Sequence, residues 1–225
     1  MTLQLPAEPI LAVAFDLDGL LFNTEHVFHL ATVELVESRG LPMPTGLLRA
    51  MMGKRPQDSY GIMKDMLGVS ESASELHDET HERFFRLLEH HLQPMPGVFE
   101  LLDHIERLGL PKAVATSSPR LYLKQMLTRF ELTDRFAFSL TAEDVDQGKP
   151  APDIYLLAAS QHGIEPQRML VFEDSENGTN AGAAAGAFVI SVPHDHSREH
   201  DFSSAEFVAE TLLDPGVATI LNARQ

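Results

Sequence analysis

Two carboxylates follow one short apolar run near the start of the chain. In the stretch VAFDLDGLLFNTE, residues 13 to 25, Asp16 comes directly after apolar residues and Asp18 comes two positions later. Such a run is typical of a buried β-strand, and charges at its end are costly unless a cation meets them. A metal ion is the simplest cation for this place, and it points to chemistry there.

Polar side chains follow other apolar runs of the chain in the same way. Hydroxyls follow the second run, an acidic pair follows the fourth, and a lysine precedes a predicted helix; these residues are Thr116, Ser117, Ser118, Glu173, Asp174 and Lys149. Taken singly, each is as well explained by a helix cap, a turn or a solvated loop. Because the ends of central strands in a doubly wound sheet converge on one crevice, we expect the four groups to form one site.

The residue types at these positions are suited to phosphoryl transfer. Aspartate carboxylates with a backbone carbonyl form the hard oxygen site that Mg²⁺ prefers. Asp16 could attack phosphorus, while Asp18 could protonate the leaving oxygen and later deprotonate water. Thr116 and Ser117 could bind phosphate oxygens at a helix N-terminus, and Lys149 could neutralise the charge that develops.

Short apolar runs that alternate with longer helical patterns must position these groups. The predicted strands are residues 11–15, 113–116, 136–140, 169–172 and 188–192, and the predicted helices between them are residues 98–108, 120–130, 153–162 and 178–187. The runs do not alternate apolar with polar residues, which favours strands covered on both faces. The sequence therefore predicts an α/β protein with a doubly wound parallel sheet.

One long segment interrupts this alternation after the first strand. It has no strand pattern, and its predicted helices are residues 25–38, 46–52, 56–66 and 72–91. We expect residues 22–94 to form an inserted, all-helical cap domain, and residues 1–21 with 95–225 to form the α/β core. An insertion at this point would lie beside the strand ends that bind ligands, as a lid does.

Composition limits the classes of protein to which the chain could belong. It has 225 residues, no cysteine and a net charge of −16, which excludes disulfides and thiolate metal sites and disfavours nucleic acid and anionic membranes as partners. The first residues do not match a signal peptide, and no apolar run approaches the ~20 residues of a membrane helix. We expect a cytoplasmic protein that acts on a small phosphorylated metabolite, as a monomer or a weak dimer.

The motifs DLDGLLFNTE, ATSS, GKPAPD and FEDSENG resemble the four signature motifs of the haloacid dehalogenase superfamily, in the right order and over nearly the whole chain. The resemblance is to the β-phosphoglucomutase-like branch. It implies a five-stranded parallel core, a helical cap that opens and closes, Mg²⁺ and a phospho-aspartate intermediate. It also implies a role for each matching residue: Asp16 as nucleophile, Asp18 as acid/base, Thr116, Ser117 and Lys149 as phosphate ligands, and a metal held by Asp16, the Asp18 carbonyl and Asp174, with Glu173 as a ligand or next to the ligands.

Departures from the mutase pattern separate the possible reactions within this resemblance. Where β-phosphoglucomutase carries a His, a Lys and an Arg in its cap, this chain has Phe28, Met52 and Pro56. Those side chains cannot grip a distal phosphate, which favours a phosphatase for a sugar or polyol phosphate. Lys54 and Arg55 are candidates for substrate contact from the cap, although two solvated cations explain them equally well.

Two other readings of the sequence stay open. A phosphosugar mutase is the first, and a phospho-accepting regulatory domain is the second, although the long insertion and the acid/base Asp18 both disfavour a regulator. The segment PHDHSREHDF could suggest a transition-metal site, but a polar loop explains its side chains better; they are His194, Asp195, His196 and His200. Asn23, where the family often has Asp, leaves neither fold nor catalysis in doubt.

Overall fold

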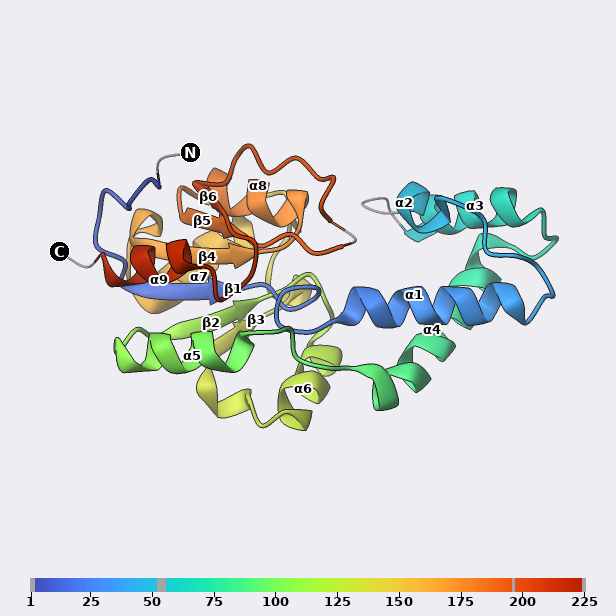
Figure 1. The fold of residues 1–225 in the computed structure, drawn as a ribbon, viewed down its shortest axis with the longest axis horizontal. Coiled ribbons are helices and arrows are strands. Elements are labelled where there is room, and N and C mark those ends of the chain that lie inside the picture. Colours follow the sequence, from blue (N-terminus) through green and yellow to red (C-terminus); the bar gives the residue numbers. More distant parts are fainter. Residues whose placement is uncertain (1–2, 52–55, 196, 224–225) are drawn as a thin grey trace. The chain divides into compact units, whose positions relative to one another are not determined.

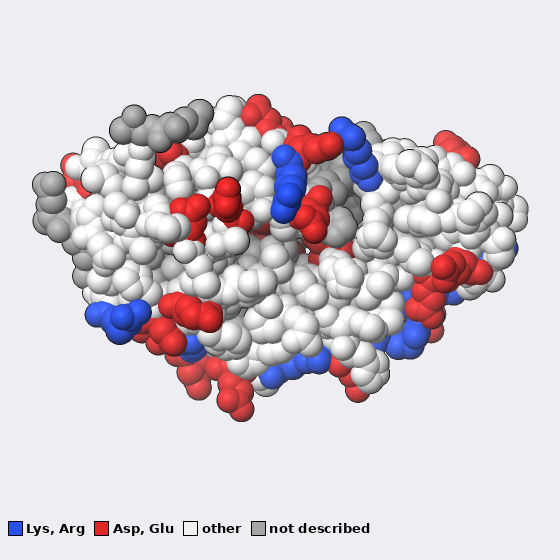
Figure 2. All heavy atoms as spheres, in the orientation of Figure 1, with Lys and Arg blue, Asp and Glu red and all other residues white. Residues whose placement is uncertain are grey.

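The computed structural model of the chain describes residues 3–51, 56–195 and 197–223. The chain forms two compact units, Met1–Phe22 with Pro94–Gln225, and Asn23–Gln93. No helix among the described residues is long and apolar enough to cross a membrane. On the face drawn in Figure 2, acidic side chains lie interspersed with basic ones.

The first unit is built on a six-stranded parallel sheet in the order β3-β2-β1-β4-β5-β6 (Figure 1). Its strands are β1 (Ala12–Phe15), β2 (Lys112–Ala115), β3 (Phe138–Leu140), β4 (Met169–Glu173), β5 (Phe188–Ser191) and β6 (Phe207–Val208). The four central strands are buried along their whole length, as expected where helices cover both faces. The order reverses between β1 and β4, which is the ligand-binding switch point of doubly wound sheets.

The register of the sheet brings the ends of β1 and β4 together. Phe15 pairs with Val114 on one side and with Phe172 on the other. The backbone N–H of Asp16 continues the ladder and donates to the carbonyl of Phe172 at 3.0 Å. The residues that follow β1 and those that end β4 therefore lie at the same edge of the sheet.

Helices cover both faces of this sheet. They are α5 (Val98–Arg107), α6 (Arg120–Arg129), α7 (Asp153–His162), α8 (Glu176–Ala185) and α9 (Pro215–Asn222), with short 3₁₀ turns at Thr133–Arg135, Ala142–Asp144 and Pro166–Arg168. Helix α7 packs on β1 and β2, and α8 packs on β4 and β5, around a core that includes Ala14, Tyr155 and Val171. On the opposite face the rings of Phe15 and Phe172 stack, with 5.1 Å between their centroids.

The second unit is entirely helical in its described residues. It consists of α1 (Thr24–Glu37), α2 (Leu47–Met51), α3 (Pro56–Leu67) and α4 (Ala73–His91). Helix α4 packs against α1 and α3, and α2 packs against α3, around a core that includes Leu35, Met63 and Leu76. A capping box of Ser72 and Glu75 starts α4, since each side chain accepts a backbone N–H from the other residue.

The predicted α/β fold with a helical insertion is confirmed, but the sheet has six strands rather than the predicted five. The sixth, β6, is only two residues long and pairs with β5, so its sequence carries no periodic signal. Helix α9 follows it and was likewise not predicted. Helix α8 starts at Glu176 rather than at Gly178, because the side chain of Ser175 accepts the N–H of Gly178 as an N-cap.

Candidate active site

Three carboxylates meet at the edge of the sheet where the strand order reverses. Asp16 follows β1, Glu173 ends β4, and Asp174 comes next; one ligand oxygen from each lies within 4.8 Å of the others. All three residues are buried, with 6%, 0% and 5% of their surface exposed. Because carboxylates in such a place repel one another, the site requires a compensating cation.

Lys149 supplies one compensating charge. Its Nζ lies 2.5 Å from Asp16 Oδ1 and 2.5 Å from Glu173 Oε1, and it also donates to the carbonyl of Ala115 at 3.0 Å. The lysine side chain is 6% exposed, so all three hydrogen bonds form away from bulk water. Such charge-assisted bonds hold the ammonium group between the two strand ends in one position.

Glu173 is saturated by donors from the protein. Besides Lys149, Oε1 accepts the hydroxyl of Tyr155 at 2.6 Å, while Oε2 accepts the hydroxyl of Ser175 at 3.1 Å and the N–H of Asp174 at 3.2 Å. A Cβ on Gly178 would come within 1.8 Å of Oε1, so only glycine leaves room for this carboxylate. Glu173 is thus built into the wall of the site.

The pKa of Asp16 and the pKa of Lys149 are both raised, for different reasons. Burial raises the pKa of Asp16 from 3.8 to about 7; the Lys149 ammonium opposes that rise, and the charges of Glu173 and Asp18 add to it. Burial alone would lower the pKa of Lys149, but Asp16 and Glu173 hold it well above 10.5. The lysine therefore stays charged and favours the ionised form of Asp16.

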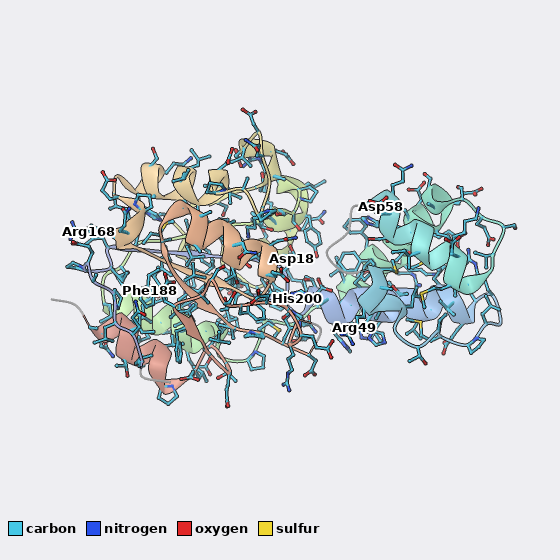
Figure 3. All side chains as sticks on the ribbon, turned by 90° about the horizontal axis from the view of Figure 1, so that it is seen from above. Asp18, Arg49, Asp58, Arg168, Phe188 and His200 are labelled. Carbon is cyan, nitrogen blue, oxygen red and sulfur yellow. The ribbon has the colours of Figure 1, made fainter. Side chains whose placement is uncertain are left out.

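Asp18 is held by hydroxyl groups from the segment that follows β2. Its Oδ2 accepts the hydroxyl of Ser118 at 2.6 Å and that of Thr116 at 3.3 Å, and its Oδ1 accepts the hydroxyl of Tyr122, on α6, at 3.2 Å. Figure 3 shows Asp18 in the first unit. These three donors fix the carboxylate of Asp18 near Asp16. The charge of Asp18 raises the pKa of Asp16.

In the loop between β2 and α6, the hydroxyls of Thr116 and Ser118 already have hydrogen-bond partners. The hydroxyl of Thr116 also accepts the N–H of Ser118 at 3.0 Å, whereas Ser117 is exposed. The N–H of Arg120, in the first turn of α6, donates to Glu143 at 2.9 Å. A phosphate at this loop would therefore have to meet Ser117 and loop N–H groups rather than this first-turn amide.

Asp174 has a partner that the sequence did not suggest. His194, in the loop after β5, places Nε2 at 2.8 Å from Asp174 Oδ2. Gly19 approaches both, because a Cβ there would lie 2.3 Å from Asp174 Oδ2 and 2.6 Å from His194 Nε2. The loops after β1, β4 and β5 thus meet at this hydrogen bond.

The other residues of the histidine-rich loop point elsewhere. His200 Nδ1 accepts the N–H of Glu176 at 3.4 Å, and Asp195 pairs with Arg198 at 3.2 Å. His196 lies outside the described residues, as do Lys54 and Arg55, the two predicted substrate contacts. Within the described ranges, the group able to hold a metal is the acidic trio, not this loop.

The structure brings most of the predicted site residues to one edge of the sheet. Asp16, Lys149, Glu173 and Asp174 form one connected cluster, and Thr116 contacts Asp18 beside it. Sequence reasoning missed the roles of four further side chains, namely Ser118, Tyr122, Tyr155 and His194. Ser118 was visible in ATSS, but the others lie in helices or in a loop with no pattern that tells where a side chain points.

The donor set fits a hard divalent cation. Asp16 and Asp174 are carboxylates on adjacent strand ends, and oxygen donors of this type suit Mg²⁺ rather than softer metals. Lys149 leaves part of the buried negative charge uncompensated, since this one ammonium pairs with Asp16 and Glu173 and the cluster holds a third carboxylate, Asp174. A cation held by Asp16 and Asp174 would remove that imbalance.

Known proteins are similar to this chain in sequence and in fold. The phosphorylated carbohydrates phosphatase of Thermotoga maritima is 33% identical over 175 residues, which cover 78% of this chain and 81% of the relative. Hexitol phosphatase B of Escherichia coli is 31% identical over 193 residues, covering 82% and 84%. The crystal structure of a HAD family hydrolase from Deinococcus radiodurans, with bound phosphate and sodium, superposes with a TM-score of 0.78 at 27% identity and covers 94% of this chain and 93% of that one.

A model of a whole protein family also matches most of this chain. The model for haloacid dehalogenase-like hydrolases matches residues 13–192, which run from β1 to the residue after β5. This stretch contains every site residue discussed above except His194 and the other residues of its loop. The chain belongs to the haloacid dehalogenase-like hydrolase family.

Proposed function

We propose that this hydrolase is a Mg²⁺-dependent phosphatase that removes the phosphoryl group of a small sugar or polyol phosphate through an aspartyl-phosphate intermediate. The observation that carries the proposal is the buried cluster of Asp16, Glu173 and Asp174 around Lys149. Relatives named as phosphatases of phosphorylated carbohydrates and of hexitols support the class of substrate.

Asp16 is the proposed nucleophile. It stands at the switch point of the sheet, and Lys149 at 2.5 Å favours its carboxylate over its acid form. The carboxylate oxygen would attack phosphorus, the bond from phosphorus to the ester oxygen would break, and the phosphoryl group would pass to Asp16. Lys149 would stabilise the charge on the transferring phosphoryl oxygens, because it is fixed and shielded from water.

Asp18 is the proposed general acid and base. Its three hydroxyl partners orient it. Each hydroxyl can rotate so that its oxygen accepts a hydrogen bond from Asp18 once Asp18 is protonated. Protonated Asp18 would give its proton to the departing alkoxide. The resulting carboxylate would then take a proton from the water that attacks the phospho-aspartate.

The metal would be held by Asp16, Asp174 and the carbonyl of Asp18. When bound, Mg²⁺ supplies positive charge that lowers the repulsion between the phosphate ester and the Asp16 carboxylate. Glu173 has a different proposed role, because its oxygens already accept four protein donors. It holds Lys149 in place. Ser117 remains a proposed phosphate ligand on the loop after β2, and Thr116 remains one on condition that its hydroxyl turns away from Asp18.

A panel of phosphorylated metabolites tests this proposal. The purified protein is incubated with sugar, polyol and nucleotide monophosphates and with p-nitrophenyl phosphate, with and without Mg²⁺, and released phosphate is measured. We expect Mg²⁺-dependent release, fastest for a sugar or polyol phosphate. No release from any ester contradicts the proposal.

The same panel distinguishes a phosphatase from a mutase. With β-glucose 1-phosphate and a glucose 1,6-bisphosphate primer, a coupled glucose-6-phosphate dehydrogenase assay reports isomerisation. We expect phosphate release without accumulation of glucose 6-phosphate, because Phe28 cannot bind a phosphate where the mutase has a histidine. Sustained NADPH formation with little phosphate release would favour the mutase instead.

A further inference from the structure

His194 lies at the metal end of the proposed site, although the proposed reaction does not use it. Its Nε2 is 2.8 Å from Oδ2 of Asp174, and both side chains are largely buried, with 13% and 7% exposed. A hydrogen bond in such surroundings is stronger than one in water, since the solvent does not compete for it.

The loop after β5 fixes the backbone of His194. The N–H of His194 donates to the hydroxyl of Ser197 at 3.1 Å, and the N–H groups of Ser197 and Arg198 both donate to the carbonyl of His194 at 3.0 Å. Ser197 is itself buried. These hydrogen bonds hold the backbone of His194, from which the imidazole reaches Asp174.

The loop after β1 packs against the hydrogen bond between His194 and Asp174. Gly19 has φ +80° and leaves no room for a Cβ against either Asp174 or His194. Gly19 follows Asp18 directly in the chain, so the backbone that carries both catalytic aspartates packs on the His194–Asp174 pair. A surface hydrogen bond would not be enclosed in this way.

We propose that His194 is a positioning residue for the metal site: Nε2–H donates to Oδ2 of Asp174 and holds that carboxylate in the orientation in which it binds a divalent cation. The inference rests on the proposed function, because it needs Asp174 to be a metal ligand. A hydrogen bond at one oxygen restricts rotation of the carboxylate and leaves its other oxygen aimed in one direction. Partners of this kind typically contribute a factor of roughly 10–100 in metal affinity.

A pair of variants with equal side-chain length isolates the hydrogen bond. His194→Gln keeps an N–H donor of similar reach, whereas His194→Met has nearly the same length and no donor. Both have room, because His194 lines a pocket of about 190 Å³ together with Gly19 and Arg198. His200→Ala is the matched control, since it removes from the same loop a histidine whose ring accepts the N–H of Glu176.

Calorimetric titration of Mg²⁺ into the substrate-free full-length protein, at one fixed pH, gives the affinity without turnover. Urea unfolding in EDTA shows separately whether each variant folds. We expect wild type, His200→Ala and His194→Gln to bind alike, and His194→Met to bind roughly 10–100-fold more weakly while it remains folded. If His194→Met does not fold, His194→Asn replaces it, because that side chain is too short to reach Asp174.

The outcomes separate this inference from the proposed function. Wild-type protein that binds no Mg²⁺ contradicts the proposed metal site itself. Wild-type binding together with equal affinities for the Gln variant and the variant lacking the donor, whether strong or weak, overturns the role of His194. A deficit in the donor-free variant that glutamine restores supports it.

Discussion

At the residue scale, chemistry in this protein depends on which oxygen atoms already have partners. Glu173 is fully hydrogen-bonded by Lys149, Tyr155, Ser175 and a backbone N–H, whereas Asp16 has the lysine as its principal cationic partner. The two residues have similar burial and adjacent strands. Their different surroundings are the reason to assign one to the wall of the site and the other to attack on phosphorus.

Replacement of the proposed nucleophile tests that assignment. In Asp16→Asn the amide oxygen can still accept from Lys149, and Glu173 still balances the lysine charge, so we expect the fold to persist. Turnover of p-nitrophenyl phosphate should fall by at least about 10³-fold, because the amide is a poor nucleophile. Circular dichroism and steady-state kinetics measure the two properties. Near-normal turnover by a folded variant would exclude this role for Asp16.

Replacement of Asp18 should separate the two half-reactions. p-Nitrophenolate leaves without help from an acid, so Asp18→Asn should still form the phospho-enzyme, but attack by water should slow by roughly 10²–10⁴-fold. Rapid mixing should then show a burst of p-nitrophenol, close to one per enzyme, followed by very slow release. Unchanged steady-state turnover contradicts an acid/base role.

Strand ends could be identified from sequence because a charged residue after a buried run is a local signal. Asp16, Asp18 and Asp174 were found in this way. Tyr155 and Tyr122 could not be, since they lie within helices whose rotation about their axes is decided by packing. His194 was assigned to a polar loop because the only available cue was the spacing of its neighbours, and spacing does not tell which side chain turns inward.

At the element scale, helix α8 must approach β4 closely enough to enclose the Glu173 carboxylate. The small residues of this helix permit the approach, and Gly178 is the tightest point, at 1.8 Å from a hypothetical Cβ to Oε1. The sequence predicts a helix here, over residues 178–187. It did not indicate that one glycine makes room for a charged group.

Gly178→Ala should therefore act against its own helix propensity. Alanine favours helices over glycine, but here the added methyl displaces Glu173, so we expect a loss of about 1–3 kcal/mol in unfolding free energy and loss of turnover as Lys149 shifts. Gly61→Ala in α3 is the matched control, because nothing lies within 4 Å of its Cβ. The control should gain about 0.4–1 kcal/mol. Urea unfolding and phosphatase assays of both variants check the contrast, and equal behaviour would refute the packing argument.

An ion cluster on α5 should make stability sensitive to acid. Arg135, followed by Lys112, lowers the pKa of Glu106 from 4.5 to about 2. Because the folded pKa is depressed, the contribution of Glu106 is complete above pH 4.5 and is lost as the pH falls towards 2. The Glu106 side chain is 42% exposed, so we reduce its contribution for solvent screening to about 1 kcal/mol.

Glu106→Gln measures that contribution. We expect a deficit of about 1 kcal/mol in unfolding free energy at neutral pH, which shrinks as the pH falls below the ordinary value of a glutamate. Urea titrations at a series of pH values follow the difference between variant and wild type. The exposed Glu82→Gln, on α4, serves as control and should stay within about 0.5 kcal/mol of wild type. A deficit that does not change with pH would argue against the depressed pKa.

Element boundaries followed closely from apolar periodicity, and the exceptions have physical causes. Helix α7 has the predicted bounds, whereas α8 begins two residues before its predicted start because Ser175 caps it. Strand β6 escaped notice since two residues at a sheet edge need no periodic pattern. Backbone pairing with β5, rather than a pattern in its own sequence, makes these two residues a strand.

At the scale of the whole molecule, metal binding should be visible in both activity and stability. A cation that binds the folded site and not the unfolded chain raises the unfolding free energy with its concentration. We expect EDTA to abolish turnover, Mg²⁺ to restore it, and the thermal midpoint of wild type to rise with added Mg²⁺. Asp174→Asn should lose most of that rise, because it removes a ligand charge. Full activity after thorough chelation would exclude the metal requirement.

The fold class was within reach of the sequence because it depends on local order along the chain, and the same order predicts which groups react. The choice of substrate was not, because the sequence does not place the side chains of the helical insertion. Lys54 and Arg55 lie outside the described residues, so their roles stay predictions.

The charge balance of the buried cluster bears on the sequence of binding events. When all are ionised, the three carboxylates of Asp16, Glu173 and Asp174 and the one ammonium of Lys149 leave an excess of two negative charges. A phosphate ester is itself an anion, so without a bound cation this cluster would repel it. Addition should therefore be ordered, with the divalent cation first and the ester second. Inorganic phosphate, for the same reason, should inhibit only enzyme that already carries its metal.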